Sequence, residues 1–390
     1  MPLDWRSRLI HSQARAPEGF RSLATPTYRG STTLFTSAAD VTDHWDQEHV
    51  RYSYGLYGTP TSFELAARIA DLEGAHHCFI TPGGQAAIAL IYLTFARAGG
   101  HVLVADSVYG PSRELAERLL SRLGVETEYY DPLIGADIRH LLRPTTQLIW
   151  CESPGSVTME VQDIGAISNA AHEAGVATAL DNTYAAGVLF DAFAAGIDVA
   201  MQALTKYVGG HSDVLLGSVT TRDHRHYQAL GDARQLLGMG ASPDDCSLAI
   251  RGLQTLAVRL DQLEKSTLAV ARWLEQQPEI TRLRHPAFAS CPGHEIWKRD
   301  FAGSASIFSV EFVPSIPRDV IVRLLDELKL FRIGYSWGGV ISLVMPHFDL
   351  RRRFPNHSPS MVRFNIGLEA VGDLIADLEA AFSAIRGRPR

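Results

Sequence analysis

The sequence has few cysteines and no long apolar run, and these two absences exclude several classes of protein. No apolar run approaches the roughly 20 residues that a membrane-spanning helix requires, and the first 20 residues lack the apolar stretch of a secretory signal. The cysteines are far apart and form no Cys-x-x-Cys pair, so a zinc site is not expected: Cys78, Cys151, Cys246 and Cys291. We expect buried, reduced thiols in a cytoplasmic protein without a membrane partner.

Positive charge is not in excess either. The chain carries 36 lysines and arginines against 43 aspartates and glutamates, with a net charge of −7 at pH 7. An acidic protein of this kind is not expected to bind nucleic acid or an anionic membrane surface. The 390 residues are 46% hydrophobic and 20% charged, which is typical of a globular protein with a large core.

Lysine is scarce, because only four of the 36 basic residues are lysines. Lys265, Lys298 and Lys329 stand in the polar stretches LEKS, WKRD and ELKL, which are typical of solvated side chains. Lys206 differs, since it lies in ALTKYVGGHSD, a glycine-rich turn between two strand-like runs. A lysine amine can condense with an aldehyde and a guanidinium cannot. We therefore predict that Lys206 is present for its nucleophilic amine.

Strand-like runs alternate with helical patterns between residues 61 and 250. HVLVAD, TQLIWCE, VATALDN and DVAMQAL are continuous apolar runs, typical of strands that are buried on both faces. Strands that alternate with helices predict an α/β fold with a mostly parallel sheet. Residues 1–60 are irregular and predict an extended arm that docks on another surface.

The pattern changes after residue 250. One long helix is predicted over residues 253–276, with an apolar stripe formed by four leucines, Leu253, Leu256, Leu260 and Leu263. Further strand-like and helical segments follow. Together they predict a smaller C-terminal α+β domain over residues 251–390.

Unusual residues gather at the predicted carboxyl ends of the strands, where open parallel sheets bind their ligands. Gly84 and Gln85 open a helix, whose free N–H groups and dipole suit a phosphate. Tyr109 follows HVLVAD, Asp181 ends VATALD, and Lys206 follows DVAMQALT. Each alone is compatible with a helix start, a packed ring or a capping carboxylate. In combination they supply what pyridoxal 5′-phosphate requires: a phosphate site, a stacking face, an anion for the pyridine nitrogen and an amine.

Three stretches resemble the Cys/Met-metabolism family of pyridoxal-phosphate enzymes: ESPGSVTMEVQD, DNTYAAGVLFDAFAAGIDVAMQALTKYVGGHSD and GYSWGG. The resemblance covers nearly the whole chain and implies a fold-type-I architecture. It implies an N-terminal arm over residues 1–60, a cofactor domain over 61–250 and a C-terminal domain over 251–390. It also implies a homotetramer built from catalytic dimers.

The resemblance implies roles around the cofactor. Lys206 matches the lysine that is covalently linked to it, Asp181 matches the partner of the pyridine nitrogen, and Tyr109 matches the stacked ring; all three are expected to be catalytic. The phosphate-binding positions match Gly84, Gln85 and Thr205.

Four further positions match residues that contact the substrate or the neighbouring subunit. Arg363 matches the arginine that binds the substrate α-carboxylate, a bidentate contact that suits a guanidinium. Ser336 matches a second carboxylate contact, with Trp337 beside it. Tyr54 matches a tyrosine that reaches the cofactor and substrate of the neighbouring subunit.

Two positions depart from the family pattern. Leu56 stands where the family usually has an arginine that binds the partner's phosphate, and Ala203 stands where a serine is often found. Loss of the arginine removes a positive charge from the surroundings of a dianion. We expect Tyr57, main-chain N–H groups or another arginine to compensate.

The resemblance implies α,β-elimination of L-cystathionine to homocysteine, pyruvate and ammonia, because YSWGG and ESPGS match the β-eliminating branch. The γ-acting enzymes, cystathionine γ-synthase and γ-lyase, tend to carry SLGG and ESPTNP instead. A broader cysteine-S-conjugate β-lyase or cysteine desulfhydrase is a further alternative, since its core residues would be the same. A cofactor-binding protein without catalysis is an alternative of a different class.

Overall fold

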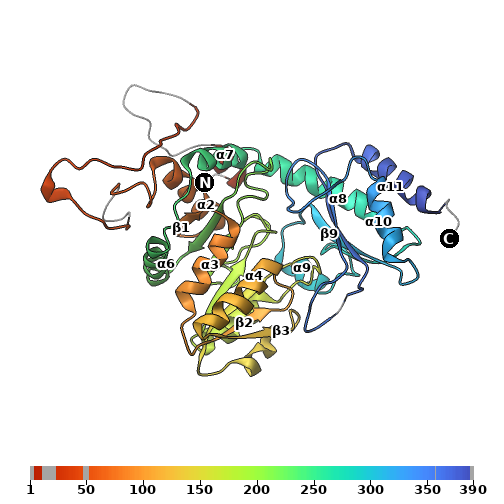
Figure 1. Ribbon diagram of the computed structural model, residues 1–390, viewed down its shortest axis with the longest axis horizontal. Helices are drawn as coiled ribbons and strands as arrows, with labels where there is room; N and C mark the ends of the chain where they lie inside the picture. Colours follow the sequence, from red (N-terminus) through yellow and green to blue (C-terminus); the bar gives the residue numbers. More distant parts are fainter. Residues whose placement is uncertain (1–3, 11–22, 47–51, 356, 387–390) are drawn as a thin grey trace.

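The computed structural model describes residues 4–10, 23–46, 52–355 and 357–386 (Figure 1). Parts of the predicted arm, residues 1–3, 11–22 and 47–51, lie outside the described residues. Within the described ranges, no helix combines the length and the apolar character that crossing a membrane requires. All four cysteines are free, and three of them are buried.

The larger sheet has seven strands in the order β1-β7-β6-β5-β4-β2-β3. Its strands are β1 (His77–Thr81), β2 (His101–Ala105), β3 (Glu126–Tyr130), β4 (Thr146–Glu152), β5 (Ala177–Asp181), β6 (Val199–Gln202) and β7 (Gly217–Thr221). Strands β3, β2, β4, β5 and β6 pair in parallel, and β7 is antiparallel to both of its neighbours. The predicted α/β fold with a mostly parallel sheet is therefore confirmed.

Helices cover both faces of this sheet, which explains why its strands are apolar throughout. Successive side chains of a strand point to opposite faces, so Val102 and Val104 of β2 pack with α3 and α6, whereas Leu103 and Ala105 pack with α5. The helices of this part are α2 (Pro60–Glu73), α3 (Gly84–Phe95), α4 (Gly110–Leu115), α5 (Ile164–Glu173), α6 (His224–Leu236) and α7 (Pro243–Leu253). Helix α4 continues as π-helical and 3₁₀ turns to Leu123, and a 3₁₀ segment spans Gly135–Leu141.

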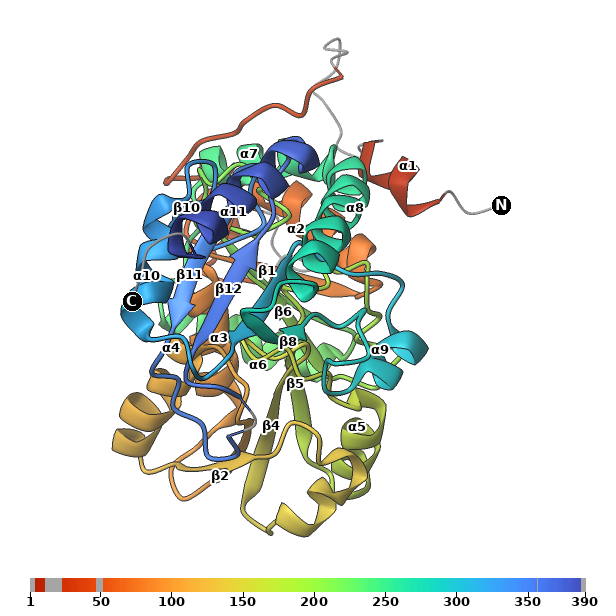
Figure 2. The same cartoon turned by 90° about the vertical axis from the view of Figure 1, so that its right-hand side faces the viewer.

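A second sheet follows in the C-terminal part, with the strand order β10-β11-β12-β9-β8 (Figure 2). Its strands are β8 (Ile280–Arg284), β9 (Ile307–Phe312), β10 (Arg332–Ile333), β11 (Leu343–His347) and β12 (Met361–Asn365). All neighbours pair antiparallel except β10 and β11. Helices α8 (Leu256–Glu275), α10 (Arg318–Glu327) and α11 (Val371–Arg386) pack on this sheet through a common apolar cluster, and α9 (His294–Asp300) lies nearby.

The long helix predicted over residues 253–276 is confirmed as α8, although it begins three residues later than predicted because the chain bends between α7 and α8. A Cβ on Gly252 would lie 2.1 Å from the carbonyl oxygen of Val208, so the end of α7 lies directly against the turn that follows Lys206. The Arg259 guanidinium of α8 donates to the carbonyls of Gly252 and Tyr207 at 2.7 and 2.6 Å. This tertiary contact turns the chain where the local pattern alone favours continuation.

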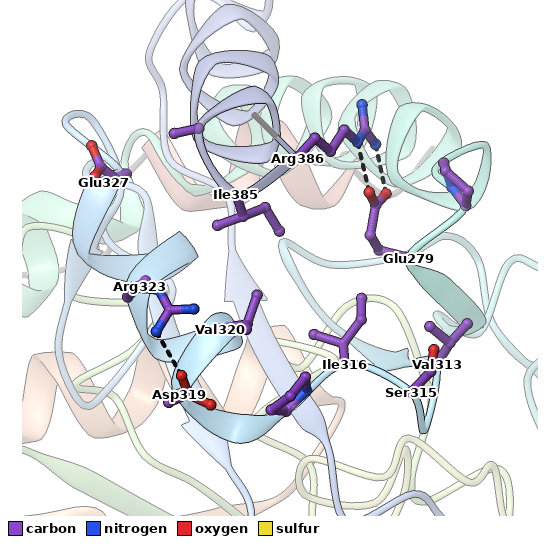
Figure 3. Close-up of a pocket in the computed structure, with 13 residues that line it drawn as sticks. Glu279, Val313, Ser315, Ile316, Asp319, Val320, Arg323, Glu327, Ile385 and Arg386 are labelled. Carbon is purple, nitrogen blue, oxygen red and sulfur yellow. Dashed lines mark hydrogen bonds and ion pairs between the residues drawn. The ribbon is translucent and has the colours of Figure 1, made fainter. Parts of the chain in front are cut away.

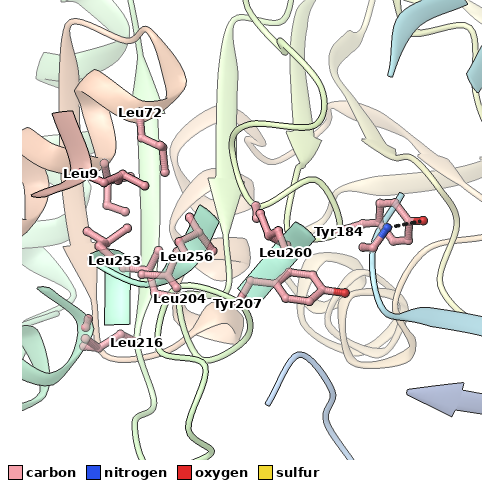
Figure 4. Close-up of a cluster of buried hydrophobic side chains, with 14 of the residues drawn as sticks. Leu9, Leu72, Tyr184, Leu204, Tyr207, Leu216, Leu253, Leu256 and Leu260 are labelled. Atoms are coloured by element: carbon pink, nitrogen blue, oxygen red, sulfur yellow. Dashed lines mark hydrogen bonds between the residues drawn. The ribbon is translucent and has the colours of Figure 1, made fainter. Parts of the chain in front are cut away.

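The buried cluster around this bend fixes the turn that carries Lys206 (Figure 4). Leu204 and Tyr207, on either side of the lysine, are buried in the same cluster as Leu9 of α1 (Trp5–Ile10) and Leu72 of α2. The predicted leucine stripe also belongs to this cluster, although it is divided between two helices. The apolar packing therefore holds the main chain on both sides of residue 206.

The described part of the arm docks on α6. The Trp45 ring is buried against Gly231, where an added Cβ would lie 2.0 Å from the ring, and its Nε1 donates to Asp232 at 2.8 Å. A short 3₁₀ turn (Ala38–Asp40) precedes this anchor, and an isolated bridge joins Thr32 to Tyr54.

Candidate active site

A cavity of about 340 Å³ opens at the carboxyl ends of β4, β5 and β6, between the two sheets. Its volume lies within the usual range for small-molecule sites. Eight of the ten predicted site residues line it: Gly84, Gln85, Tyr109, Asp181, Thr205, Lys206, Trp337 and Arg363. Ser336 joins this group through its contact with Lys206. Tyr54 is not among the residues that line the cavity.

The start of α3 forms one wall of the cavity. Gly84 is the first residue of the helix, and the first N–H groups of any helix have no intrahelical acceptor. A Cβ on Gly84 would lie 2.7 Å from the Ala203 Cβ, so this position tolerates only glycine without movement. The Gln85 side chain donates to the carbonyl of Pro111 at 3.0 Å, which leaves its main-chain N–H as the group that faces a ligand.

Thr205 forms hydrogen bonds with Leu216, which directly precedes β7. Its hydroxyl donates to the Leu216 carbonyl and accepts from the Leu216 N–H, both at 3.2 Å. To donate to a phosphate oxygen, the Thr205 hydroxyl must break its hydrogen bond to the Leu216 carbonyl.

The Lys206 amine is held at the centre of the site. Its Nζ donates to the Ser336 Oγ at 2.6 Å and lies 5.3 Å from the centre of the Trp337 ring. Burial, and next the charge of Arg363, lower the pKa of Lys206 to about 8, although Asp181 acts in the opposite direction. The amine is therefore much easier to deprotonate than an exposed lysine.

Asp181 ends β5 and is buried. Both hydrogen bonds from Thr183, one from its N–H and one from its hydroxyl, reach Oδ1. Within the described residues the other oxygen, Oδ2, accepts no hydrogen bond and is available to a ligand. Burial raises the pKa of Asp181, while Thr183 and the charge of Lys206 counteract this shift.

Tyr109 precedes α4, and its N–H donates to the Glu152 Oε2 at 2.7 Å. Glu152 ends β4 directly opposite Asp181 and also lines the cavity. Burial, and next the charge of Asp181, raise the pKa of Glu152 well above its usual range. The sequence analysis missed Glu152, although a carboxylate at the end of the buried run TQLIWCE was a signal that could have identified it.

Arg363 brings a cation to the cavity from β12 of the second sheet. Its Nη2 donates to the Ser336 main-chain carbonyl at 3.3 Å. Burial lowers the pKa of Arg363 to about 10, so it remains charged at neutral pH. A charged, buried guanidinium beside a serine hydroxyl forms a suitable site for a carboxylate.

The segment around Leu56 lies apart from this cavity. Tyr54 is exposed and packs edge-on against Tyr57 at 6.4 Å. The Tyr57 hydroxyl donates to Asp43 at 2.7 Å, and Arg234 donates to the carbonyls of Leu56 and Tyr57. Tyr57 and Arg234 are thus engaged within the same chain, and what compensates for Leu56 stays a prediction.

These residues fit pyridoxal phosphate. The helix start offers N–H groups to a phosphate, Asp181 keeps one oxygen free for a ring nitrogen, and Lys206 has a lowered pKa. Among the described residues that line the cavity, Lys206 and Arg363 are the only cations.

Another pocket of about 650 Å³ lies between α10, α11 and the segment after β9 (Figure 3). Arg386 of α11 binds Glu279 on the other side of this pocket, and Arg323 binds Asp319 one turn away on α10. None of the predicted site residues lines it.

Comparison with known proteins agrees with this geometry. The model of the family described as Cys/Met metabolism PLP-dependent enzyme matches residues 6–383. A putative cystathionine β-lyase of Rhizobium johnstonii is 42% identical over 365 residues, which cover 92% of this chain and 91% of that protein. A cystathionine β-lyase of Escherichia coli is 42% identical over 346 residues, which cover 85% of this chain and 86% of that protein.

Two further proteins that are similar to this chain are named for reactions other than β-elimination. The crystal structure of a cystathionine γ-synthase from Xanthomonas oryzae pv. oryzae has a TM-score of 0.91 at 26% identity, covering 99% of each chain. An L-alanine/L-glutamate racemase of Wolbachia pipientis is 36% identical over 378 residues, covering 93% of each chain.

Proposed function

Because the chain belongs to the Cys/Met metabolism family of PLP-dependent enzymes, we propose that it catalyses α,β-elimination of L-cystathionine to homocysteine, pyruvate and ammonia. The observation that carries the proposal is the position of the Lys206 amine, hydrogen-bonded to Ser336 in a cavity that also holds Asp181 and Arg363. The relatives that are 42% identical favour β-elimination over the other reactions of the family.

The cofactor-binding roles are assigned as follows. The N–H groups of Gly84 and Gln85 hold the phosphate, with Thr205 beside them. The free oxygen of Asp181 would accept a hydrogen bond from the ring nitrogen and keep that nitrogen protonated, and Tyr109 would stack on the ring. Pyridoxal phosphate, when bound, supplies the sink for the electrons released at the substrate Cα.

The remaining residues bind the substrate and move protons. Arg363 and Ser336 fix the α-carboxylate, with Trp337 beside them, and thereby orient the Cα–H bond. The Lys206 amine takes the Cα proton, a role that its pKa of about 8 suits. The Cβ–S bond then breaks, Lys206 returns the proton to the departing sulfur, and water hydrolyses the remaining three-carbon unit to pyruvate and ammonia.

The test is the product analysis of purified enzyme with L-cystathionine. Pyruvate and homocysteine support the proposal, whereas 2-oxobutyrate and cysteine indicate a γ-acting enzyme and contradict it. Comparing kcat/KM for cystathionine, cystine and cysteine separates it from a broader cysteine-conjugate lyase or desulfhydrase.

A matched pair of lysine variants tests the assignment of roles. Lys206→Ala should abolish pyruvate formation and leave the fold intact, because only one side chain in a preformed cavity is shortened. Lys265→Ala, at an exposed position of α8, is the control and should retain activity. Pyruvate formation by Lys206→Ala would contradict the assignment. A protein that never gains a visible absorbance band with added cofactor would favour a non-catalytic role.

A second candidate function is racemisation of a small amino acid, favoured by the racemase that is 36% identical. It needs proton removal and return at Cα without loss of a Cβ substituent. Formation of D-alanine from L-alanine at a rate above that of pyruvate from cystathionine would favour this function.

We also propose a homotetramer of catalytic dimers in the cytoplasm, with an arm over residues 1–60, a cofactor domain over 61–250 and a C-terminal domain over 251–390. The exposed position of Tyr54, outside its own cavity, supports a role in the partner's site. Mixing Tyr54→Ala and Lys206→Ala subunits tests this role. Activity should return in mixed dimers, because one of their two sites then holds both residues.

A further inference from the structure

The buried amide of Asn365 clamps the turn that carries Ser336 and Trp337. Asn365 is 1% exposed and ends β12, two residues after Arg363 and therefore on the same face of the strand. Its Oδ1 accepts from the Gly338 N–H at 2.9 Å, and its Nδ2 donates to the Ile341 carbonyl at 3.2 Å. One side chain thus binds both ends of the segment that follows Trp337.

The same amide is connected to the residue next to Lys206. Ser306 Oγ donates to the Asn365 Oδ1 at 2.8 Å, so its own proton is already used. The 2.8 Å contact between Ser306 Oγ and the Tyr207 hydroxyl must therefore be donated by Tyr207. The Tyr207 oxygen in turn accepts from the Ser306 N–H at 2.9 Å. The Ser306 N–H, both hydroxyls and one N–H of the Asn365 amide each have an acceptor in this buried chain.

This chain of hydrogen bonds requires an amide at residue 365. Oδ1 accepts two hydrogen bonds, and Nδ2 supplies one donor to a carbonyl. Turning the amide over would place its NH₂ against the N–H of Gly338, and a carboxylate would place an oxygen against the Ile341 carbonyl. Unsatisfied or repelling polar groups destabilise a buried network. Residue 365 must therefore supply both an acceptor and a donor, as an amide does.

The turn held in this way is strained. Ser336 has a φ of 73°, a left-handed conformation that is unfavourable for a residue with a Cβ, and such conformations persist only where the surroundings hold them. A Cβ on Gly338 would lie 3.1 Å from the Tyr207 nitrogen, so the turn lies directly against the main chain after Lys206. The Trp337 ring packs on Tyr207 at 5.3 Å.

We propose that Asn365 is a positioning residue that holds Ser336 and Trp337 in the arrangement that receives the substrate α-carboxylate beside Arg363. The inference rests on the proposed function only in that an α-amino carboxylate is the group bound. Asn365 itself is not among the described residues that line the cavity, and its side chain bonds to Gly338, Ile341 and Ser306. It acts through the turn, in concert with Ser306 and Tyr207.

The experiment compares Asn365→Asp, Ser306→Ala and Tyr207→Phe with the parent enzyme, all loaded with cofactor. Affinity is measured for 2-methylalanine, an amino acid without a Cα proton, by the change in cofactor absorbance. Binding of this probe does not depend on elimination, so a failure of the proposed function appears separately as absence of pyruvate from cystathionine. Ser168→Ala is the control, because Ser168 is buried in α5 and its hydroxyl has no hydrogen-bond partner within the described residues.

We expect Asn365→Asp to weaken binding of 2-methylalanine about tenfold or more, and to raise KM for the substrate by a similar factor with a smaller change in kcat. Ser306→Ala and Tyr207→Phe should weaken binding about threefold, since Asn365 still holds Gly338. Ser168→Ala should bind as the parent does. Binding unchanged in Asn365→Asp, or a lower melting temperature without weaker binding, overturns the inference. If Asn365→Asp does not fold, parent-like binding by both other variants overturns it.

Discussion

Burial prepares the Lys206 amine before any ligand is present. The side chain is removed from water, and Arg363 adds a second positive charge nearby, so the pKa falls to about 8 from 10.5. Water stabilises the protonated, charged form of the amine, so burial of the side chain favours the neutral amine. The neutral amine is the nucleophile that attacks an aldehyde, so the same environment suits both roles proposed for Lys206, cofactor attachment and proton transfer.

Uptake of pyridoxal phosphate by cofactor-free protein should follow this pKa. The rate should rise as the pH increases through about 8, because the neutral fraction at pH 7.5 is roughly a quarter instead of about one in a thousand. Stopped-flow measurement of the visible absorbance band between pH 6.5 and 9.5 tests this. A rate that still increases about tenfold per pH unit between pH 8.5 and 9.5 would contradict the lowered pKa.

At the scale of elements, helix α3 and the turn after β6 approach each other too closely for any side chain at Gly84. The helix start and Ala203 are in contact, and the N–H groups of the helix face the cavity. The small residue at position 203 and the glycine at position 84 therefore belong to one packing arrangement.

Gly84→Ala should push α3 away from the turn and reduce cofactor affinity. A new methyl group 2.7 Å from Ala203 cannot be accommodated without movement, and overpacking of this kind typically costs about 1–3 kcal/mol. We expect the dissociation constant of pyridoxal phosphate to rise about tenfold. Gly372→Ala, in the open first turn of α11, controls for the general effect of the substitution and should leave cofactor affinity unchanged.

The arm depends on another glycine, Gly231 of α6. Gly231→Ala should expel the Trp45 ring, since the new Cβ would lie 2.0 Å from it. The released arm should be cleaved at least about tenfold faster in limited proteolysis, because local opening controls cleavage. Gly165→Ala in α5, where the nearest atom is 3.9 Å away, is the control. Parent-like cleavage of Gly231→Ala would show that Trp45 does not anchor the arm.

At the scale of the whole molecule, a buried arginine joins the two sheets. Arg284 of β8 is 0% exposed and binds Glu311 of β9 and the segment after β4, through the Thr158 carbonyl at 3.0 Å and Glu160 at 3.5 Å. That segment contributes residues 154–157 and Met159 to the wall of the cavity. The position of the cavity wall therefore depends on an ion pair that bridges the sheets.

Arg284→Met should destabilise the protein by about 3–5 kcal/mol, because two buried carboxylates lose their cation. Denaturant unfolding of the loaded enzyme measures the effect. Glu295→Ala removes an exposed pair with Lys298, whose side chains are 80% and 54% exposed, and should change stability by less than about 1 kcal/mol. Equal effects of the two substitutions would contradict a structural role for the buried pair.

Much of the fold and of the site followed from local patterns. The strands that end at Asp181 and precede Lys206 were predicted because strands buried on both faces must be apolar throughout. The bend at Gly252 was missed, because contact with residues 208 and 209 causes it and no local pattern reports such a contact. Glu152 was missed although its place at the end of a buried run was a local signal, whereas Asn365 was missed because its contacts with residues 306 and 338 have no local signal.

The sequence by itself determined the class of fold, here confirmed as fold type I, and the cofactor, and it predicted the residues that we propose to bear the cofactor's chemistry. These depend on residue type and on position after a strand, which are local properties. Only the tertiary structure decided that Ser336 contacts Lys206, which lies 130 residues away in the chain. It also decided that Asn365 holds the turn that carries Ser336. Such contacts arise from the packing of two sheets against each other, and a hydrogen bond between distant segments has no local pattern in the chain.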